Sequence, residues 1–331
     1  MGTLHAPSAT AVIPAKAGIQ PHRRGEKGRL FAGGEMKVCD SIFDGHAALV
    51  LERSRRVHEE IAEGLTKEGA IPLTVGAFQM RNQCGGEAGK QRNLERMLSA
   101  IRTAAAQGVQ MLAFPEMCLP GYFTPVSGTA EEAVAANHAL ADIVGESPYV
   151  EALKAAARDS RMVLAFGFAE RVGGVVYNAI GVIDANGEWL GTRRKAPLYP
   201  WPFELDSFAE PGPKHRSVVF RTKYATVGIS NCFDGEFPES IRRMRLEGAE
   251  ILLWCNAACG DSHFGTSHRI HHSQAHAQAN NMWVVCCNCV AENASGTSLI
   301  ASPHAEPLVI LPPDEEALAI AKNIGMPNNN I

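Results

Sequence analysis

The sequence predicts an α/β protein built as a four-layer α-β-β-α sandwich, with two mixed sheets packed face to face. Three observations support this prediction. Short apolar runs alternate with amphipathic helical segments from residue 71 onward. Ala185-Asn186-Gly187, between two such runs, is a strong hairpin signal. Residues 223–257 have the pattern strand, turn, helix, strand, and we expect parallel strand pairs to dominate there.

The expected elements follow the spacing of apolar residues along the chain. Leu94, Met97, Leu98 and Ile101 lie on one face of a long helix, and Gly108 suits its C-terminal cap. We expect strands at residues 72–80, 109–114, 162–168, 175–184, 189–194, 217–220, 225–229, 251–254, 283–288, 297–300 and 308–311. We expect helices at residues 90–106, 131–144, 149–158, 240–247 and 267–280.

Three segments divide the chain. Residues 71–325 carry the predicted domain, and residues 326–331 look like an unstructured tail. Residues 1–70 form an N-terminal extension that we expect to be partly disordered, with a helix near residues 46–67. That helix either packs on a partner subunit or leads into the domain while exposed to solvent.

Composition and charge exclude several classes of protein. The 331-residue chain has a net charge of −4 and a pI near 6.3, which gives no reason to expect nucleic acid or an anionic membrane as partner. No apolar run approaches the roughly 20 residues needed to span a bilayer, and we see no secretory signal. We expect a cytoplasmic protein.

The cysteines fit that compartment. The chain has nine of them, an odd number, and several fall within apolar strand-like runs. This pattern predicts buried thiols in a reducing environment, in preference to a disulfide framework or a zinc site.

Cys232 lies at the corner of the strand–turn–helix unit. Asp234 and Gly235 suit a turn, and Pro238 suits the first turn of the helix that follows. Amides of that helix would point toward the sulfur and favour its thiolate. A nucleophilic cysteine is one interpretation; for a lone cysteine, a small core residue is the commoner outcome.

Three predicted strands end next to a chemically useful residue: Glu116, Lys195 and Cys232. Strand ends line the usual ligand crevice of α/β sheets. A cysteine nucleophile needs a base, which Glu116 can provide, and an acyl substrate needs oxyanion donors, which Lys195 and the amide of Phe233 can provide. Glu116 could also be a loop carboxylate and Lys195 a surface charge, so spacing alone leaves the assignment open.

Longer motifs around these residues resemble the carbon–nitrogen hydrolase (nitrilase) superfamily. They are Phe114-Pro-Glu116 with Leu119-Pro-Gly-Tyr122, the Lys195 segment, and Cys232-Phe-Asp-Gly-Glu-Phe-Pro-Glu239 with Gly248-Ala-Glu250. The resemblance covers roughly residues 72–311 and implies the same sandwich fold. It also implies that Glu116 is the general base, Lys195 the oxyanion-stabilising lysine and Cys232 the nucleophile that forms a thioester. Glu204 best matches a second glutamate of the family, although it could be a loop carboxylate without contact to the site.

Details of the motif favour one branch of that superfamily. The Cys-x-Asp-Gly-x-Phe-Pro-Glu segment and the Pro200–Glu204 loop are similar to amidases and formamidases. Carbamoyl-amino-acid hydrolases carry arginines where this chain has Gly235 and Glu236, so a carboxylate pocket of that kind is not expected. Glu236 either attracts an amine on the substrate or complements a helix dipole. We place Tyr122, Trp201 and Glu236 in the substrate-binding set.

The sequence departs from the family in places that affect assembly more than chemistry. A helix that usually ends in Arg-Ala-x-Glu-Asn here ends in His276-Ala-Gln-Ala-Asn280. The C-terminus stops earlier than expected, and residues 1–70 match nothing in the common core. Family members are commonly dimers or larger, which implies a homo-oligomer.

A group of histidines stands apart from these motifs. His268, His271 and His272 are spaced i, i+3, i+4 on one predicted helix, as metal ligands can be. No glutamate accompanies them as in the helix motif of zinc proteases. We therefore expect a polar helix face or a subunit contact, and no metal.

Together the residues and the resemblance predict a thiol hydrolase of linear, non-peptide amide C–N bonds that needs no cofactor. The alternatives are an N-carbamoyl amide hydrolase and a catalytically silent family member used as an interaction module. The sequence does not identify the acyl or amine part of the substrate.

Overall fold

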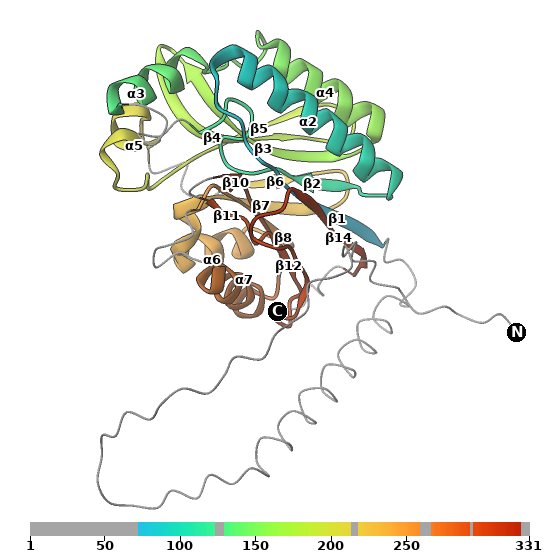
Figure 1. The fold of residues 1–331 in the computed structure, drawn as a ribbon. Helices are drawn as coiled ribbons and strands as arrows, with labels where there is room; N and C mark the ends of the chain where they lie inside the picture. Colours follow the sequence, from blue (N-terminus) through green and yellow to red (C-terminus); the bar gives the residue numbers. More distant parts are fainter. Residues whose placement is uncertain (1–71, 123–128, 213–217, 259–265, 292–293, 326–331) are drawn as a thin grey trace, which may run out of the picture. The chain divides into compact units, whose positions relative to one another are not determined.

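A computed structural model describes residues 72–122, 129–212, 218–258, 266–291 and 294–325. These residues form two six-stranded sheets with helices on their outer faces, as Figure 1 shows. The predicted extension at residues 1–70, its helix near 46–67 and the tail at 326–331 lie outside the described residues. The predicted α-β-β-α sandwich is confirmed.

The elements follow one another in the order that apolar periodicity predicts. The strands are β1 (Leu73–Gln79), β2 (Met111–Ala113), β3 (Val163–Val172), β4 (Val175–Ile183), β5 (Trp189–Arg194), β6 (Val219–Arg221), β7 (Thr226–Asn231), β8 (Ile251–Asn256), β9 (Trp283–Asn288), β10 (Val290–Ala291), β11 (Ala294–Ser295), β12 (Leu299–Ala301), β13 (Pro307–Ile310) and β14 (Ala317–Ile324). The helices are α2 (Gly86–Ala106), α3 (Ala130–Ala139), α4 (Pro148–Ser160), α5 (Pro202–Ser207), α6 (Pro238–Leu246) and α7 (Thr266–Asn280), with the 3-10 helix η3 (Cys232–Glu236).

Each sheet has three parallel strands at its centre. The first sheet has the order β14-β1-β2-β3-β4-β5, with β1, β2 and β3 parallel. The second has the order β13-β12-β9-β8-β7-β6, with β7, β8 and β9 parallel. The outer strands run antiparallel to their neighbours. The predicted parallel pairing around residue 232 is therefore confirmed.

The main core lies between the two sheets. Val75 and Val163 of the first sheet and Val227 and Leu253 of the second belong to one buried cluster. Side chains on alternate strand positions point to the outer faces, because successive residues of a strand face opposite ways. On the first sheet they pack against α2 and α4, and on the second against α6 and α7. Both faces of the central strands are buried, which explains their continuous apolar runs.

Several elements were not expected from the sequence, among them the short strands β10 and β11, the strand β14 and the helix α5. β14 extends the first sheet by pairing antiparallel with β1, although no strand was expected after residue 311. Its register places Ala319 beside Ala77 and Leu318 beside Phe78, and Ala319, Ala321 and Ile324 are buried in the core between the sheets. The short helix α5 begins at Pro202, inside the predicted proline-rich loop, since proline suits a first helical turn.

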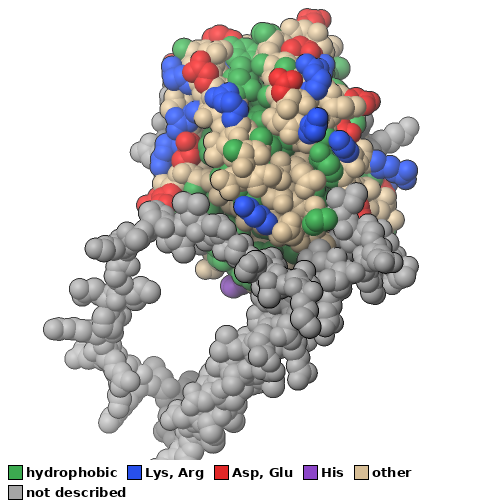
Figure 2. All heavy atoms as spheres, turned by 90° about the vertical axis from the view of Figure 1, so that its right-hand side faces the viewer, with side chains coloured by type: hydrophobic (Ala, Val, Ile, Leu, Met, Phe, Trp, Pro, Cys, Tyr) green, Lys and Arg blue, Asp and Glu red, His purple; other side chains and the backbone are tan. Residues whose placement is uncertain are grey.

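The described surface agrees with the charge balance of the sequence. On the face shown in Figure 2, basic and acidic side chains are interspersed with hydrophobic ones. Among the described helices, none has the length and apolar character that crossing a membrane requires.

Candidate active site

The turn that carries Cys232 is held by buried polar contacts. Asp234 accepts hydrogen bonds from the Ser230 hydroxyl and the Asn231 amide, both at 2.6 Å. Its other oxygen lies 2.7 Å from Arg193 Nη2, and both residues of this ion pair are buried. Cys232 has a φ of 49°, a left-handed backbone that L residues adopt rarely and that is found at strained nucleophile turns. These contacts hold Cys232 in its left-handed backbone conformation.

The expected thiolate is not supported. Burial and the negative charge of Glu116 raise the pKa of the Cys232 thiol well above its ordinary value, although Lys195 and Arg269 act in the opposite direction. The helix that follows Cys232 is a five-residue 3-10 turn, and α6 begins only at Pro238. The raised pKa favours a neutral thiol over a thiolate at Cys232.

Glu116 lies just beyond β2 and is fully buried. Its Oε1 accepts hydrogen bonds from Lys195 Nζ at 2.8 Å and Asn178 Nδ2 at 2.7 Å. Its Oε2 accepts the amide of Ala257 at 3.0 Å. Asn178 of β4 and Ala257 after β8 were not found by sequence reasoning, because an amide side chain and a backbone N–H leave no recognisable motif.

Lys195 lies between two carboxylates. Its Nζ is 2.8 Å from Glu116 and 2.6 Å from Glu204, and all three side chains are at most 2% exposed. Burial alone would lower the pKa of Lys195, but the attraction of Glu116 and Glu204 outweighs it and raises that pKa well above the usual value. This raised pKa favours the charged ammonium form of Lys195. The alternative view of Lys195 as a surface charge and of Glu204 as a remote loop carboxylate is wrong.

Tyr122 completes this chain of contacts. Its hydroxyl donates a 2.7 Å hydrogen bond to Glu204 Oε2. Burial and the negative charges of Glu204 and Glu116 raise the pKa of Tyr122 well above its ordinary range, so the phenol stays neutral. Glu204 Oε1 also accepts the amide of Tyr199 at 3.2 Å. Each charged group on this side of the pocket therefore has at least one hydrogen-bonding or ion-pair partner.

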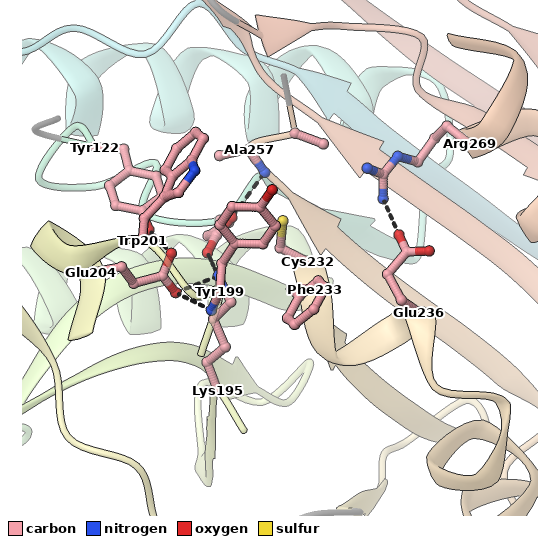
Figure 3. A pocket seen from close by; sticks show the side chains of 12 residues that line it. Tyr122, Lys195, Tyr199, Trp201, Glu204, Cys232, Phe233, Glu236, Ala257 and Arg269 are labelled. Atoms are coloured by element: carbon pink, nitrogen blue, oxygen red, sulfur yellow. Dashed lines mark hydrogen bonds and ion pairs between the residues drawn. The ribbon is translucent and has the colours of Figure 1, made fainter. Parts of the chain in front are cut away.

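All the side chains predicted for the site line one pocket of about 480 Å³, a volume that includes its open mouth. The residues that line it are Glu116, Tyr122, Lys195, Tyr199, Trp201, Glu204, Cys232, Phe233, Glu236, Ala257, Ala258 and Arg269. In the view of Figure 3, Lys195 and Glu204 lie on one side of Cys232, and Glu236 and Arg269 lie on the other. The aromatic rings of Tyr199, Trp201 and Phe233 pack against one another near the sulfur.

The side of the pocket with Arg269 differs from the prediction. Arg269 of α7 is 1% exposed, donates a 2.6 Å hydrogen bond to Asn256 Oδ1 and lies 3.7 Å from Glu236. An arginine in the pocket was considered only at the positions directly after Cys232-Phe-Asp234, and Arg269 lies on a later helix. Its place in the pocket could not be predicted from sequence, because only the fold brings α7 beside η3.

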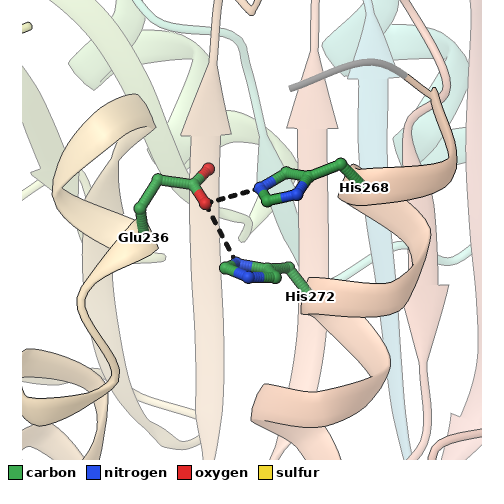
Figure 4. A group of neighbouring side chains, drawn as sticks. All are labelled: Glu236, His268 and His272. Carbon is green, nitrogen blue, oxygen red and sulfur yellow. Dashed lines mark hydrogen bonds and ion pairs between the residues drawn. The ribbon is translucent and has the colours of Figure 1, made fainter. Parts of the chain in front are cut away.

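Glu236 does not cap a helix. Its Oε2 lies 2.7 Å from His268 Nε2 and 3.0 Å from His272 Nδ1, both on α7 (Figure 4). The acid in the first turn of α6 is Glu239 instead. Burial opposes ionisation of Glu236, but its close contacts with the two histidines and the charge of Arg269 lower its pKa below the usual value. No glutamate accompanies the histidines in the helix sequence, but Glu236 of η3 reaches them in the folded structure.

The fold and the pocket together define a class: a two-sheet α-β-β-α sandwich whose pocket holds a cysteine beside a glutamate–lysine pair. The profile of the carbon–nitrogen hydrolase family matches residues 74–323. The chain belongs to this family and is a carbon–nitrogen hydrolase.

Sequence relatives agree with this assignment. The chain is 34% identical over 208 residues to a citrullinase of Francisella tularensis, covering 61% of this chain and 70% of that protein. It is 28% identical over 267 residues to an N-carbamoylputrescine amidase of Solanum tuberosum, covering 76% of this chain and 85% of that protein.

Solved structures share the fold at low sequence identity. An amidase from Nesterenkonia sp. superposes with a TM-score of 0.62 at 23% identity, over 80% of this chain and 94% of that chain. Nit3 of Saccharomyces cerevisiae gives a TM-score of 0.65 at 18% identity, over 76% and 90%. These likenesses support the sandwich architecture.

Proposed function

We propose that the protein hydrolyses a linear, non-peptide amide C–N bond through a thioester on Cys232. The observation that carries this proposal is the fully buried Glu116–Lys195–Glu204 chain, which lines the same pocket as the Cys232 thiol. In this proposal Glu116 is the general base, Lys195 an oxyanion donor and Glu204 the group that holds the lysine in place.

The first half-reaction forms the thioester. The neutral thiol of Cys232 passes its proton to Glu116 as the sulfur attacks the carbonyl carbon, so no free thiolate is needed. Lys195 and the backbone N–H of Phe233 hold the developing oxyanion. The C–N bond then breaks, and the leaving nitrogen takes the proton from Glu116 and departs as ammonia or an amine.

The second half-reaction restores the enzyme. Water gives a proton to Glu116 while its oxygen attacks the thioester carbonyl. The C–S bond breaks, the sulfur regains a proton from Glu116, and the carboxylic acid leaves. The cycle consumes one water and needs no redox partner or cofactor. Tyr122 and Trp201 would contact the substrate as walls of the pocket: Tyr122 through its neutral phenol and Trp201 through its partly exposed indole.

A second candidate is the hydrolysis of an N-carbamoyl amine or amino acid. Two observations favour it: relatives at 28–34% identity are an N-carbamoylputrescine amidase and a citrullinase, and the charged residues Glu236 and Arg269 line the pocket. A substrate with a charged group at its far end would meet them there. The same thioester chemistry would release the amine and carbamic acid, which decomposes to carbon dioxide and ammonia.

A substrate panel tests both proposals. Simple aliphatic amides, N-carbamoyl amines, N-carbamoyl amino acids and nitriles would be compared by ammonia release, each with the wild-type protein and with Cys232→Ala. We expect turnover of at least one amide or carbamoyl compound by the wild type and none by Cys232→Ala. Full activity of Cys232→Ala on the accepted substrate would overturn the mechanism. Complete inactivity on the panel would favour the catalytically silent alternative.

Cysteine labelling adds a direct test of the nucleophile. Cys84 is the described thiol most open to solvent, whereas Cys118, Cys255, Cys286 and Cys287 are buried. A general alkylating agent would therefore also modify Cys84. A substrate-like electrophilic amide in the Cys84→Ser variant avoids this, and peptide mass spectrometry should find the adduct on Cys232. An adduct distributed over other cysteines at a similar rate would argue against the proposed nucleophile.

Location and assembly remain predictions. The described cysteines form no disulfide, which supports a reducing compartment such as the cytoplasm. Light scattering on the full chain would test the predicted homo-oligomer, and the predicted domain limits of residues 71–325 can be tested by limited proteolysis.

A further inference from the structure

The cluster of Glu236, His268 and His272 is arranged differently from an ordinary surface ion pair. The three ligand atoms lie within 4.8 Å of one another, and no other group of three or more such side chains stands out in the described part of the chain. Both imidazoles approach the same carboxylate oxygen, as Figure 4 shows. One oxygen is thus the meeting point of two nitrogens from successive turns of α7.

Hydrogen bonding accounts for only part of this arrangement. His268 Nε2 makes a 2.7 Å hydrogen bond with Glu236 Oε2. His272 Nδ1 lies 3.0 Å from the same oxygen but is not oriented for a hydrogen bond, and it has no other partner although the atom is buried. The rings of His268 and His272 lie with centroids 4.2 Å apart and only 32° from parallel. A buried imidazole nitrogen without a partner is a costly feature that a ligand would relieve.

The geometry suits a metal ion. Atoms that bind one Zn²⁺ at about 2.1 Å lie roughly 3.0–3.4 Å apart. The carboxylate oxygen lies 2.7 Å and 3.0 Å from the two imidazole nitrogens, and all three atoms lie within 4.8 Å of one another, so small side-chain shifts would bring them to one ion. Histidines at i and i+4 share one face of a helix, so His268 and His272 need no backbone movement to act together. Two imidazoles and a carboxylate suit first-row transition metals, and hard cations such as Mg²⁺ prefer all-oxygen sites.

The surroundings leave one carboxylate oxygen for the metal. Arg269 Nη1 lies 3.7 Å from Glu236 Oε1, whereas both histidines approach Oε2. The guanidinium can therefore hold the carboxylate in one orientation without occupying the oxygen that meets the imidazoles. His268 and His272 are 27% and 32% exposed, so an ion can enter from solvent.

We propose that Glu236, His268 and His272 form a binding site for a divalent transition-metal ion of the Zn²⁺ type at the edge of the substrate pocket. This reverses the expectation from sequence that the histidine helix binds no metal. Glu236 belongs both to this site and to the pocket lining, so a bound ion occupies one wall of the pocket and restricts turnover. The binding itself does not depend on the reaction proposed for Cys232.

Metal binding is tested on the full chain by titrating Zn²⁺ against a chromogenic chelator, after extensive treatment with EDTA. The variants are His268→Ala, His272→Ala and Glu236→Gln, and the matched control is His271→Ala. His271 lies on the same helix, is exposed and is outside the cluster. Thermal unfolding monitored by circular dichroism would verify that each variant is folded.

We expect the wild type and His271→Ala to bind the same number of Zn²⁺ ions. His268→Ala and His272→Ala should lose one site or bind it at least tenfold more weakly, because even changes around a ligand weaken metal binding by about 10- to 100-fold. Equal Zn²⁺ binding by His268→Ala, His272→Ala and His271→Ala would overturn the proposal, since other histidines and cysteines would then account for all of it.

Spectroscopy and kinetics give independent readouts. Cu²⁺ bound to the wild type should show nitrogen couplings in its electron paramagnetic resonance spectrum, and these should be reduced in His268→Ala but kept in His271→Ala. If turnover is found, Zn²⁺ should inhibit the wild type and His271→Ala at concentrations about tenfold lower than His268→Ala requires. Unchanged spectra in His268→Ala would contradict the proposed ligands, whatever the activity.

Discussion

The two charged ends of the pocket are built differently. At one end, Glu116, Lys195 and Glu204 are at most 2% exposed, and each charge has a partner within 2.8 Å. At the other end, Glu236 is 10% exposed and contacts half-exposed histidines, with Arg269 buried behind it. Cys232 lies between them in the pocket lining.

The difference separates two tasks. Buried and matched charges cannot reorient easily, so they can stabilise charge that develops in a transition state without reorganisation. A partly exposed group of one carboxylate, two imidazoles and a guanidinium can exchange partners with solvent, an ion or a substrate. The first end suits chemistry on the reacting bond, and the second suits recognition and control. Five changes test this contrast.

Replacing the buried cation should have the largest effect. Lys195→Met removes the proposed oxyanion donor and leaves two buried carboxylates without their shared partner. We expect turnover to fall by about 10³-fold or more and the free energy of unfolding to fall by about 3–5 kcal/mol. Initial rates and urea unfolding would measure the two effects, with Lys154→Met, a partly exposed lysine paired with Glu151, as control. Retention of a tenth of the wild-type rate would contradict a central role for Lys195.

Breaking the buried pair under the nucleophile turn should mainly reduce stability. Asp234→Ala leaves Arg193 buried without its carboxylate, and we expect a loss of about 3–5 kcal/mol in the free energy of unfolding. The exposed pair of Arg243 and Glu247 is the control, and Arg243→Ala should cost about 0.5 kcal/mol or less. Similar losses for the two variants, measured by urea unfolding, would show that burial does not distinguish these pairs.

Glu204→Gln should weaken catalysis without removing a reacting group. The amide keeps the size of the side chain but loses the charge beside Lys195, so the ammonium is free to shift. A misplacement of about 1 Å can cost roughly 100-fold in rate, and we expect a loss in kcat of that order with little change in KM. Tyr122→Phe, which removes only the hydroxyl on Glu204, should have a smaller effect. A rise in KM alone would assign Glu204 to substrate binding instead.

A change at the open end should alter selectivity. Glu236→Gln, assayed with EDTA present, should raise KM about tenfold for an N-carbamoyl amine with a cationic end, which corresponds to roughly 1.4 kcal/mol. For a neutral amide of similar length, KM should stay within about threefold. An equal rise for both substrates would show that Glu236 acts on the pocket's shape and does not recognise charge.

The smallest change is expected in the pH dependence. An acid whose pKa is raised stays protonated to higher pH, so the Cys232 thiol should remain neutral beyond its ordinary value of 9.0. The raised pKa of Lys195 likewise keeps the ammonium charged over the same range. We therefore expect kcat/KM to be flat between about pH 7 and pH 9, without the rise that a titrating thiol would cause. A tenfold rise across that interval would indicate attack by a pre-formed thiolate.

Local patterns in the sequence were sufficient for most of the fold. Apolar runs marked the central strands because their two faces are both buried, and Gly108 and Pro238 marked helix ends. β14 was missed because Ala317–Ile324 has no strong strand pattern in its own sequence. It is stabilised instead by pairing with β1, more than 230 residues earlier in the chain. The expectation that helix amides favour a thiolate at Cys232 is not supported, because burial and the charge of Glu116 raise the pKa of this thiol.

Periodicity and turn residues act over short distances along the chain, so the order of residues was enough to predict the alternation of strands and helices and the three strand ends that carry Glu116, Lys195 and Cys232. Which charges meet depends on how distant segments pack in the folded protein. This packing brings the Ala257 amide to Glu116, Arg269 into the pocket, and Glu236 between two histidines of α7. These contacts join segments distant in sequence, and electrostatic energies depend on distance and burial, which a linear pattern does not contain.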